Sequence, residues 1–277
     1  MLNVVKNIDP FKALFFDIET RGQVEKLEEG TKLYDLVEYT VARMKDYESE
    51  DQIFEYYDTQ AALSPELGAI CAISVGFIAN GVIRVTSFYG EDELVLLEEF
   101  AGFMTAMAGK FKALAGFSSN NFDIPYILVR LLANGIFEIP SLLDESTAKP
   151  WEKVNIDIKE IARLGRYSSP SLLGLCTVLG VPSPKEEISG KDVSKAFFDG
   201  RIEEIKDYCE RDVAATANCL LRLQGKELLE MESVVMEKSF REEGYRSELD
   251  RLLDTGEADL FALTKEGIRL SDRKSVV

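Results

Sequence analysis

The chain contains no histidine among its 277 residues. This absence excludes zinc hydrolases with histidine ligands, Ser-His-Asp triads and acid-base chemistry on an imidazole ring. Carboxylates, phenols and bound metal ions are the groups that remain for hydrolytic chemistry at neutral pH. The chemistry of this sequence must therefore be sought among its acids and tyrosines.

Cysteine is scarce as well, and its four positions show no metal-ligand spacing. Each lies in an apolar segment, a pattern typical of small buried side chains in a reducing compartment. Residues 1–10 lack the apolar stretch of a signal peptide, and no uncharged apolar run approaches the length of a membrane span, about 18 residues. We therefore expect a cytoplasmic protein that does not bind membranes. The cysteines are Cys71, Cys176, Cys209 and Cys219.

Basic residues are outnumbered by acidic ones, 32 against 49, which gives a formal net charge of −17. Because Lys and Arg dominate the affinity of proteins for nucleic-acid backbones, we expect any such binding to be weak, sensitive to salt and dependent on metal ions. Acidic residues are concentrated in residues 21–66. We interpret this stretch as an acidic helical insertion with a solvated face, and a partner-binding surface is the alternative.

Two acids appear abruptly in the first apolar run of the chain. If this run is a strand, Asp17 and Glu19 point to the same side. Two neighbouring carboxylates in a largely buried strand repel each other and raise one pKa strongly unless a cation neutralises them. A hard divalent cation takes such oxygen ligands. The alternative at this point is that both acids end a strand and face solvent.

A second group of interest lies on a predicted helix over residues 201–220, where apolar or small residues recur with the helical period. Tyr208 and Asp212, one turn apart, each precede a member of this stripe and so share the edge of the buried side. Such an edge can line a site. An amphipathic helix with solvated charges explains Glu210 fully, but it explains the pair Tyr208 and Asp212 less well.

The segment Asn120 to Pro125 is weaker evidence, because it has the pattern of a loop that begins a helix. Asp123 could simply cap that helix, with Pro125 in its first turn. The order and spacing of all three acidic motifs argue against so limited a role.

The three motifs together resemble the DEDD superfamily of 3′-5′ exonucleases, in the branch whose third motif is Tyr-x-x-x-Asp (DEDDy). The chain is most similar to bacterial stand-alone proteins that resemble the exonuclease domain of family-B DNA polymerases, from about Phe11 to Leu223. The sister branch uses a histidine as general base and is excluded here. The motifs and the other matching segments are 16–20, 121–123, 208–212, 68–76, 149–152 and 181–185.

This resemblance implies that four carboxylates hold two divalent metal ions, Mg²⁺ or Mn²⁺, and that Tyr208 positions the attacking water. Two metal ions a few Å apart can clamp an in-line phosphoryl displacement. A phenol with an ordinary pKa of about 10 is a poor base at neutral pH, so hydrogen bonding suits Tyr208 better than unaided proton removal. The implied metal ligands are Asp17, Glu19, Asp123 and Asp212.

The implied reaction removes nucleotides one at a time from the 3′ end of a nucleic acid and releases 5′-mononucleotides. Single-stranded DNA is the favoured substrate, and RNA or short oligonucleotides are alternatives. A non-catalytic binding module and an acidic partner protein of nucleic-acid processing, acting through residues 21–66, also stay open. The sequence indicates no particular protein partner.

The second motif departs from the family pattern, because Ser118 and Ser119 stand where an asparagine that contacts the terminal nucleotide is expected. Ser118 could donate one hydrogen bond in its place. Asn121 and Phe122 are candidates to touch the terminal sugar and base. Thr20 completes the expected substrate-binding set.

The predicted architecture is α/β and ribonuclease H-like, with a mixed five-stranded sheet flanked by helices. The second and third strands meet at Asn80-Gly81, a strong hairpin signal. We expect an exonuclease domain over residues 1–225, followed by a C-terminal helical extension and tail over 226–277. The expected strands cover 12–18, 69–79, 82–89, 111–116 and 154–158, and the main helices cover 91–107, 171–179, 193–198 and 201–220.

Overall fold

The computed structural model of the chain describes residues 2–45, 47–107, 109–140, 143, 154–164, 167–182 and 190–234. The matching segment 149–152, most of 181–185 and the tail beyond residue 234 lie outside the described residues. The helices are α1 (Leu2–Asn7), α2 (Lys32–Val41), α3 (Asp51–Gln60), α4 (Glu93–Ala106), α5 (Asp123–Ala133), α6 (Ile158–Arg163), α7 (Leu172–Leu179), α8 (Val193–Phe198) and α9 (Ile202–Leu223). The strands are β1 (Ala13–Gly22), β2 (Gly68–Ala79), β3 (Val82–Tyr89), β4 (Ala113–Gly116), β5 (Ile156–Asp157) and β6 (Met231–Ser233).

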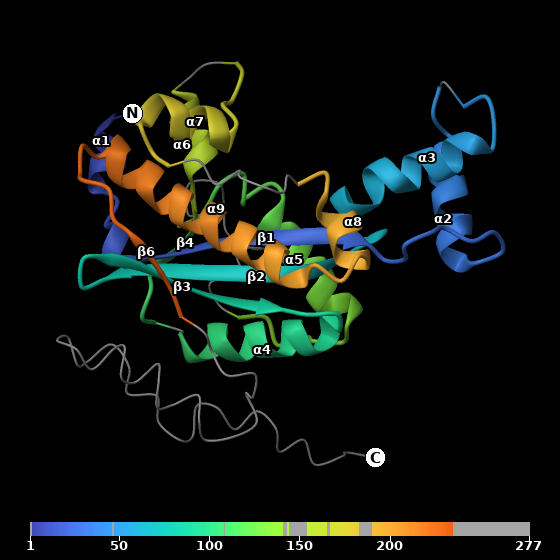
Figure 1. Cartoon of the computed structure of the whole chain (residues 1–277), viewed down its shortest axis with the longest axis horizontal. Helices are drawn as coiled ribbons and strands as arrows, with labels where there is room; N and C mark the ends of the chain where they lie inside the picture. Colours follow the sequence, from blue (N-terminus) through green and yellow to red (C-terminus); the bar gives the residue numbers. More distant parts are fainter. Residues whose placement is uncertain are drawn as a thin grey trace, which may run out of the picture.

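One mixed sheet organises the molecule, in the order β5-β4-β1-β2-β3-β6 (Figure 1). Strands β1, β2 and β3 are antiparallel neighbours, whereas β4 runs parallel to β1, and β5 parallel to β4. Asn80 and Gly81 both have positive φ, which is the backbone that a two-residue hairpin between β2 and β3 requires. The predicted α/β class, with a mixed sheet flanked by helices, is confirmed.

The predicted number of strands was wrong, because the described part of the sheet has a sixth strand, β6. It pairs in parallel with β3, and Val234 N donates to Val85 O at 2.7 Å. The sequence predicted a charged helix from Lys226 onward. Strand β6 has only three residues, all exposed, so its sequence lacks the alternation that marks a half-buried strand. The sheet therefore continues beyond the predicted boundary near Gly225.

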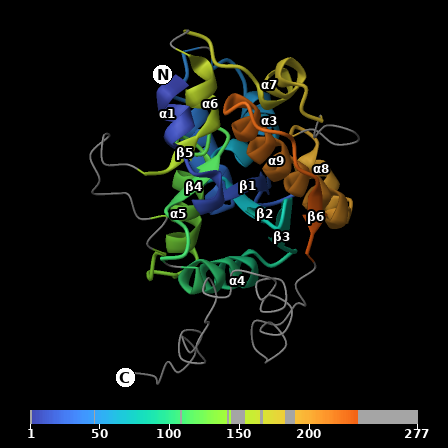
Figure 2. The ribbon, with the colours of Figure 1, turned by 90° about the vertical axis from the view of Figure 1, so that its left-hand side faces the viewer.

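Helices cover both faces of the sheet. Figure 2 shows α4 on one side and α6, α7 and α9 on the other. Alternate residues of β1 supply the two cores: Leu14 and Phe16 pack toward α4 and α5, and Ala13 and Phe15 pack toward α9. Fully burying a side chain of phenylalanine size contributes about 1.5–3 kcal/mol. Asp17 follows in the row that faces α9, so the strand pattern alone brings this acid toward that helix.

Helix α9 lies close against the sheet because one position of β2 has no side chain. A Cβ atom on Gly76 would lie 2.7 Å from Cγ1 of Val213 on α9, closer than two carbon atoms can approach. The rest of the buried stripe of α9 predicted from the sequence packs on the same face, at Cys209, Val213 and Leu220. Gly76 thereby sets the depth at which the residues of α9 meet β1.

Two helices, α2 and α3, occupy the acidic stretch between β1 and β2 (Figure 1). They have a small core of their own, in which Val37 and Ile53 are fully buried. Tyr57 ties this unit to the end of β1, since its hydroxyl contacts both N and O of Val24, at 2.9 and 3.1 Å. The stretch is thus fixed to the strand that carries Asp17 and Glu19.

Candidate active site

Strand β1 presents Asp17 and Glu19 on the face covered by α9. Glu19 is buried, with 7% of its surface exposed, and Asp17 is partly exposed. The pairing register of β1 with β2 shifts between Glu19 and Thr20, so the regular alternation stops directly after the second acid. The hydroxyl of Thr20 donates to Ala62 O at 2.6 Å and so fixes the strand to the segment before β2.

Helix α9 brings Tyr208 and Asp212 to the same place. Tyr208 is 5% exposed and packs in a cluster with α8 and β2. The charge of Asp212 acts on both Asp17 and Glu19, and the Tyr208 hydroxyl is hydrogen-bonded to Asp212. The edge of the helical stripe predicted from the sequence therefore faces the two acids of β1.

Asp123 is the first residue of α5, yet it does not act as the helix cap. The N-cap position is Phe122, and this helix end has no side-chain capping bond. The Asp123 carboxylate instead receives hydrogen bonds from its own N–H and from that of Ile18, the β1 residue between Asp17 and Glu19. Only 4% of Asp123 is exposed. The second motif, with Asp123, thus joins the first and third motifs at strand β1.

Burial and mutual repulsion raise the pKa values of these acids. Burial is the largest cause at Asp17, followed by the charges of Asp212, Asp123 and Glu19, and the pKa rises well above its usual value. The pKa of Glu19 rises chiefly by burial, and then by the charges of Asp212 and Asp123. Burial, opposed by two backbone hydrogen bonds, raises the pKa of Asp123 to about 7. A site in which several carboxylates disfavour one another's charge is one that a cation would stabilise.

The phenol of Tyr208 responds to the same surroundings. Burial and then the charges of Asp212, Glu19 and Asp17 raise its pKa above the usual value for tyrosine. The phenol therefore stays protonated at neutral pH, as an O–H group that can both donate and accept a hydrogen bond.

The donor atoms present fit a hard divalent cation. Ligand atoms of Asp17, Glu19 and Cys209 all lie within 4.8 Å of one another. Burial, followed by the charges of Asp17 and Glu19, raises the pKa of the Cys209 thiol well above its usual value. A protonated thiol is a hydrogen-bond donor and a poor metal ligand. The oxygen atoms of the carboxylates are therefore the groups suited to Mg²⁺ or Mn²⁺.

Cys209 was interpreted from the sequence only as a small buried side chain. It is buried, but its sulfur also lies 3.4 Å from O of Asp17 and 3.6 Å from Oδ2 of the same residue. The signal in the sequence was its position directly after Tyr208 on the buried stripe, three residues before Asp212. Positions three apart on a helix are neighbours on its surface, so Cys209 lies beside Asp212.

Asp157, for which no role was predicted from the sequence, holds the loop before Asp123 by hydrogen bonds. Its carboxylate accepts from the backbone N–H of Ser118 at 3.0 Å and of Asn120 at 3.3 Å, and it also caps α6. Ser118 has a positive φ of 71°, and its hydroxyl accepts from Lys159 Nζ at 3.2 Å. No helix was predicted after Asp157, but an Asp is a favoured N-cap residue, and this is the signal that could have indicated the start of α6.

The other residues of the loop before Asp123 differ in how far they are exposed to solvent. Asn121 is exposed at the start of α5. The ring of Phe122 packs on Tyr126, with a centroid distance of 5.4 Å. Ser119, in contrast, is 1% exposed, and a Cβ on Gly116 would lie 2.4 Å from its own Cβ. Of these residues, Asn121 is the one that faces solvent.

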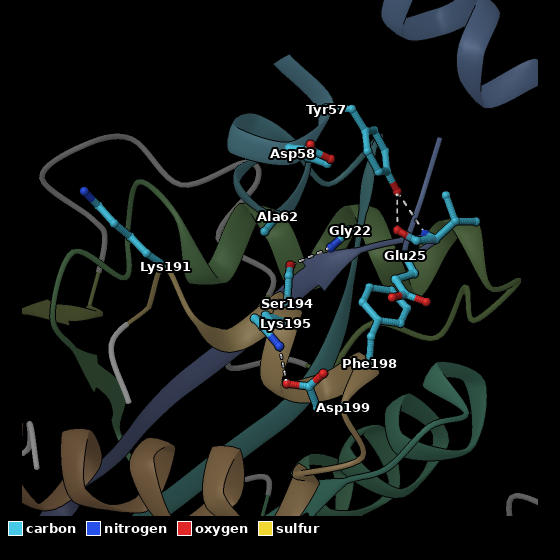
Figure 3. Close-up of a pocket in the computed structure, with 12 residues that line it drawn as sticks. Gly22, Glu25, Tyr57, Asp58, Ala62, Lys191, Ser194, Lys195, Phe198 and Asp199 are labelled. Carbon is cyan, nitrogen blue, oxygen red and sulfur yellow. Dashed lines mark hydrogen bonds and ion pairs between the residues drawn. The ribbon is translucent and has the colours of Figure 1, made fainter. Parts of the chain in front are cut away.

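A pocket lies where β1 ends, between α3 and α8 (Figure 3). Gly22 N donates to Ser194 Oγ at 3.1 Å across its floor, and Lys195 pairs with Asp199 at 2.6 Å on one side. The close-up shows Lys191 on the opposite side, away from this ion pair. None of the four predicted metal carboxylates lines the pocket, so it adjoins the acidic cluster along β1 and is not part of it.

A central strand with one buried and one partly exposed acid, met by a phenol and two further carboxylates from helices, defines an α/β protein with an acidic cluster that could hold a metal ion. The model of a family described as predicted 3′-5′ exonucleases related to the exonuclease domain of PolB matches residues 62–255. This match covers more than half of the chain, which therefore belongs to that family. The matched range includes Asp123, Tyr208 and Asp212 and begins after β1.

The chain is also similar to solved structures. The chain is similar to the structure of the family B DNA polymerase from the hyperthermophilic archaeon Pyrobaculum calidifontis, with 17% sequence identity and a TM-score of 0.47. The similarity covers 78% of this chain and 24% of the polymerase chain. No curated protein matches the chain.

Among the described helices, none combines the length and the apolar character that crossing a membrane requires.

Proposed function

We propose that the protein is a metal-dependent 3′-5′ exonuclease of the DEDDy branch, which hydrolyses nucleic-acid phosphodiesters and releases 5′-mononucleotides. The observation that carries the proposal is the convergence of Asp17, Glu19, Asp123 and Asp212, in which the charge of Asp212 raises the pKa of each of the other three. The membership of the chain in a family of predicted 3′-5′ exonucleases supports the same activity.

The four carboxylates are proposed to hold two Mg²⁺ or Mn²⁺ ions. When bound, such a pair supplies positive charge that stabilises an in-line displacement at phosphorus. Tyr208 is proposed to orient the attacking water, because a protonated phenol held by Asp212 can donate or accept one hydrogen bond at a fixed place. Its raised pKa argues against proton removal by the phenol itself.

Substrate contacts are proposed at Asn121 and Phe122, at the end of α5 that carries Asp123. Thr20 and Ser118 were predicted to take part as well. Their hydroxyl groups are already engaged with Ala62 O and Lys159 Nζ, which leaves Thr20 an acceptor and Ser118 a donor toward a substrate. Because the chain has a net charge of −17, we propose that a nucleic-acid strand is held mainly at its 3′ end. Single-stranded DNA is the proposed substrate, and RNA is the alternative.

The direct test is incubation of the protein with labelled single strands of DNA and RNA in the presence of Mn²⁺, with EDTA as control. A 5′ label should give a ladder of progressively shorter strands, whereas a 3′ label should be released at once as a mononucleotide. Strands that stay intact, that are cut internally, or that are degraded equally in EDTA would contradict the proposal. The ratio of the rates on DNA and RNA decides the preference for sugar.

A second test addresses Tyr208. Tyr208→Phe should slow the reaction by roughly ten- to a hundredfold, as expected for a group that orients without holding the metal. This loss should be smaller than that of any carboxylate variant. Tyr89→Phe is the matched control, because Tyr89 also bonds a carboxylate of α9, Glu203 at 3.0 Å, on the exposed side of that helix. Full activity of Tyr208→Phe would remove the phenol from the mechanism.

A further inference from the structure

A chain of hydrogen-bonded polar groups runs across the sheet between the acidic site and the edge strand β6. It begins at Glu210, which the sequence assigned to a solvated helix face but which is 4% exposed. Ser87 Oγ on β3 donates to Glu210 Oε1 at 2.8 Å, and Ser233 Oγ on β6 donates to Oε2 at 2.6 Å. A carboxylate can remain buried when its oxygens are satisfied in this way.

The same chain continues toward Asp17. Ser87 and Ser74 are 2.8 Å apart, oxygen to oxygen, and Ser74 is completely buried on β2. Because Ser87 gives its proton to the Glu210 carboxylate, Ser74 is the donor in this contact. The Ser74 hydroxyl also lies beside the sulfur of Cys209. Because the one proton of Ser74 goes to Ser87, the thiol proton remains for Asp17, whose backbone oxygen and Oδ2 the sulfur contacts.

These contacts restrict the orientation of the Asp17 carboxylate, one of the four proposed metal ligands. The end of an Asp side chain rotates in a broad torsional well, so a free carboxylate would present either oxygen. A thiol at 3.6 Å from Oδ2 favours one orientation of the Asp17 carboxylate over the other. The thiol is only a weak donor, so the oxygen that it contacts keeps most of its negative charge.

We propose that Cys209, supported by Ser74, Ser87 and Glu210, is a positioning residue that sets the orientation of the Asp17 carboxylate for a divalent cation. This inference rests on the proposed function, because it concerns the same metal site. It adds a role for Ser74 and Ser87, which lie outside the acidic motifs, and for Cys209 and Glu210, the two residues that directly follow Tyr208 in the third motif. It also connects the site to β6, whose Ser233 occupies the second oxygen of Glu210.

The test measures Mn²⁺ binding by titration calorimetry and by electron paramagnetic resonance, without substrate. Cys209→Ala should weaken Mn²⁺ affinity about tenfold, the usual scale for groups that orient a metal ligand. Cys209→Ser keeps a donor of similar size and should restore affinity to near that of the unchanged protein. Ser74→Ala should weaken affinity in the same direction.

Cys219→Ala is the matched control. It makes the same substitution on the same helix, at a fully buried cysteine whose sulfur contacts Cys176 at 3.7 Å and not Asp17. Its Mn²⁺ affinity should be unchanged. Equal losses in Cys209→Ala and Cys219→Ala, or no loss in Cys209→Ala and Ser74→Ala, would overturn the inference.

The Asp17→Asn variant separates this inference from the proposed function. If Asp17→Asn loses Mn²⁺ binding while Cys209→Ala binds normally, the metal site stands and the positioning role falls. If the unchanged protein does not bind Mn²⁺, or if Asp17→Asn binds it equally well, both fall.

Discussion

Asp17→Asn should remove nuclease activity and, in the same protein, raise the thermal stability of the metal-free state. The loss of activity follows from the loss of a ligand between the other acids. A metal ion contributes several kcal/mol to the stabilisation of a phosphoryl-transfer transition state, and about 4 kcal/mol corresponds to a thousandfold in rate. We therefore expect a decrease on the order of a thousandfold in the Mn²⁺-dependent release of a 3′ label.

The gain in stability follows from the electrostatics of the empty site. The charged form of Asp17 is disfavoured by burial and by the charges of Asp212, Asp123 and Glu19. Asparagine has nearly the same shape and no charge, so it removes this repulsion. Each kcal/mol raises the melting temperature by about 2–4 °C in a domain of this size, and a rise of at least about 2 °C is expected at pH 8 in EDTA.

The matched control is Asp199→Asn. The pKa of Asp199 is lowered, chiefly by its hydrogen bond with Lys195, so the same substitution there removes a favourable charge and should not raise the melting temperature. Thermal unfolding in EDTA and the nuclease assay in Mn²⁺ check both halves of the prediction. An active Asp17→Asn protein, or one that melts several degrees below the unchanged protein, would contradict the proposed site.

The elements that carry the acids were predictable because their signals are local. In β1 a period of two places Asp17 on the side of Phe15, toward α9, and in α9 a period of 3.6 places Tyr208 and Asp212 on one edge. Either pattern could be interpreted without knowing the partner element. The resemblance to a nuclease family then predicted which elements meet, and the structure brings the acids together.

The features that the sequence did not predict depend on partners distant in the chain. Glu210 looks solvated on its helix, since glutamate is rarely buried without a partner. Its burial is possible because the hydroxyl groups of Ser87 and Ser233, on two separate strands, donate hydrogen bonds to its carboxylate. Strand β6 is hidden for the same reason: three exposed residues form a strand only because the edge of β3 is there to pair with them. Such pairings leave no periodic signal.

Divalent metal ions should stabilise the protein more strongly as the pH rises from 5 to 8. Burial chiefly raises the pKa of Asp123 from its ordinary value of 3.8 to about 7. A group whose pKa is higher in the folded than in the unfolded state contributes stability that is fully present below about pH 4 and is lost as the pH rises through 7. One pKa unit corresponds to 1.36 kcal/mol, so the loss at Asp123 is on the order of 4 kcal/mol. Asp17 and Glu19 shift in the same direction.

A bound cation reverses this effect, because it stabilises the charged form of the carboxylates that the empty site disfavours. The difference in melting temperature between samples with Mn²⁺ and with EDTA, measured at pH 5, 6, 7 and 8, should therefore widen with pH. Asp123→Asn should flatten the decline in EDTA between pH 5 and 8, since it removes the group that titrates there. A difference that is the same at every pH would contradict binding at these carboxylates, because a cation bound there competes with protons in this range.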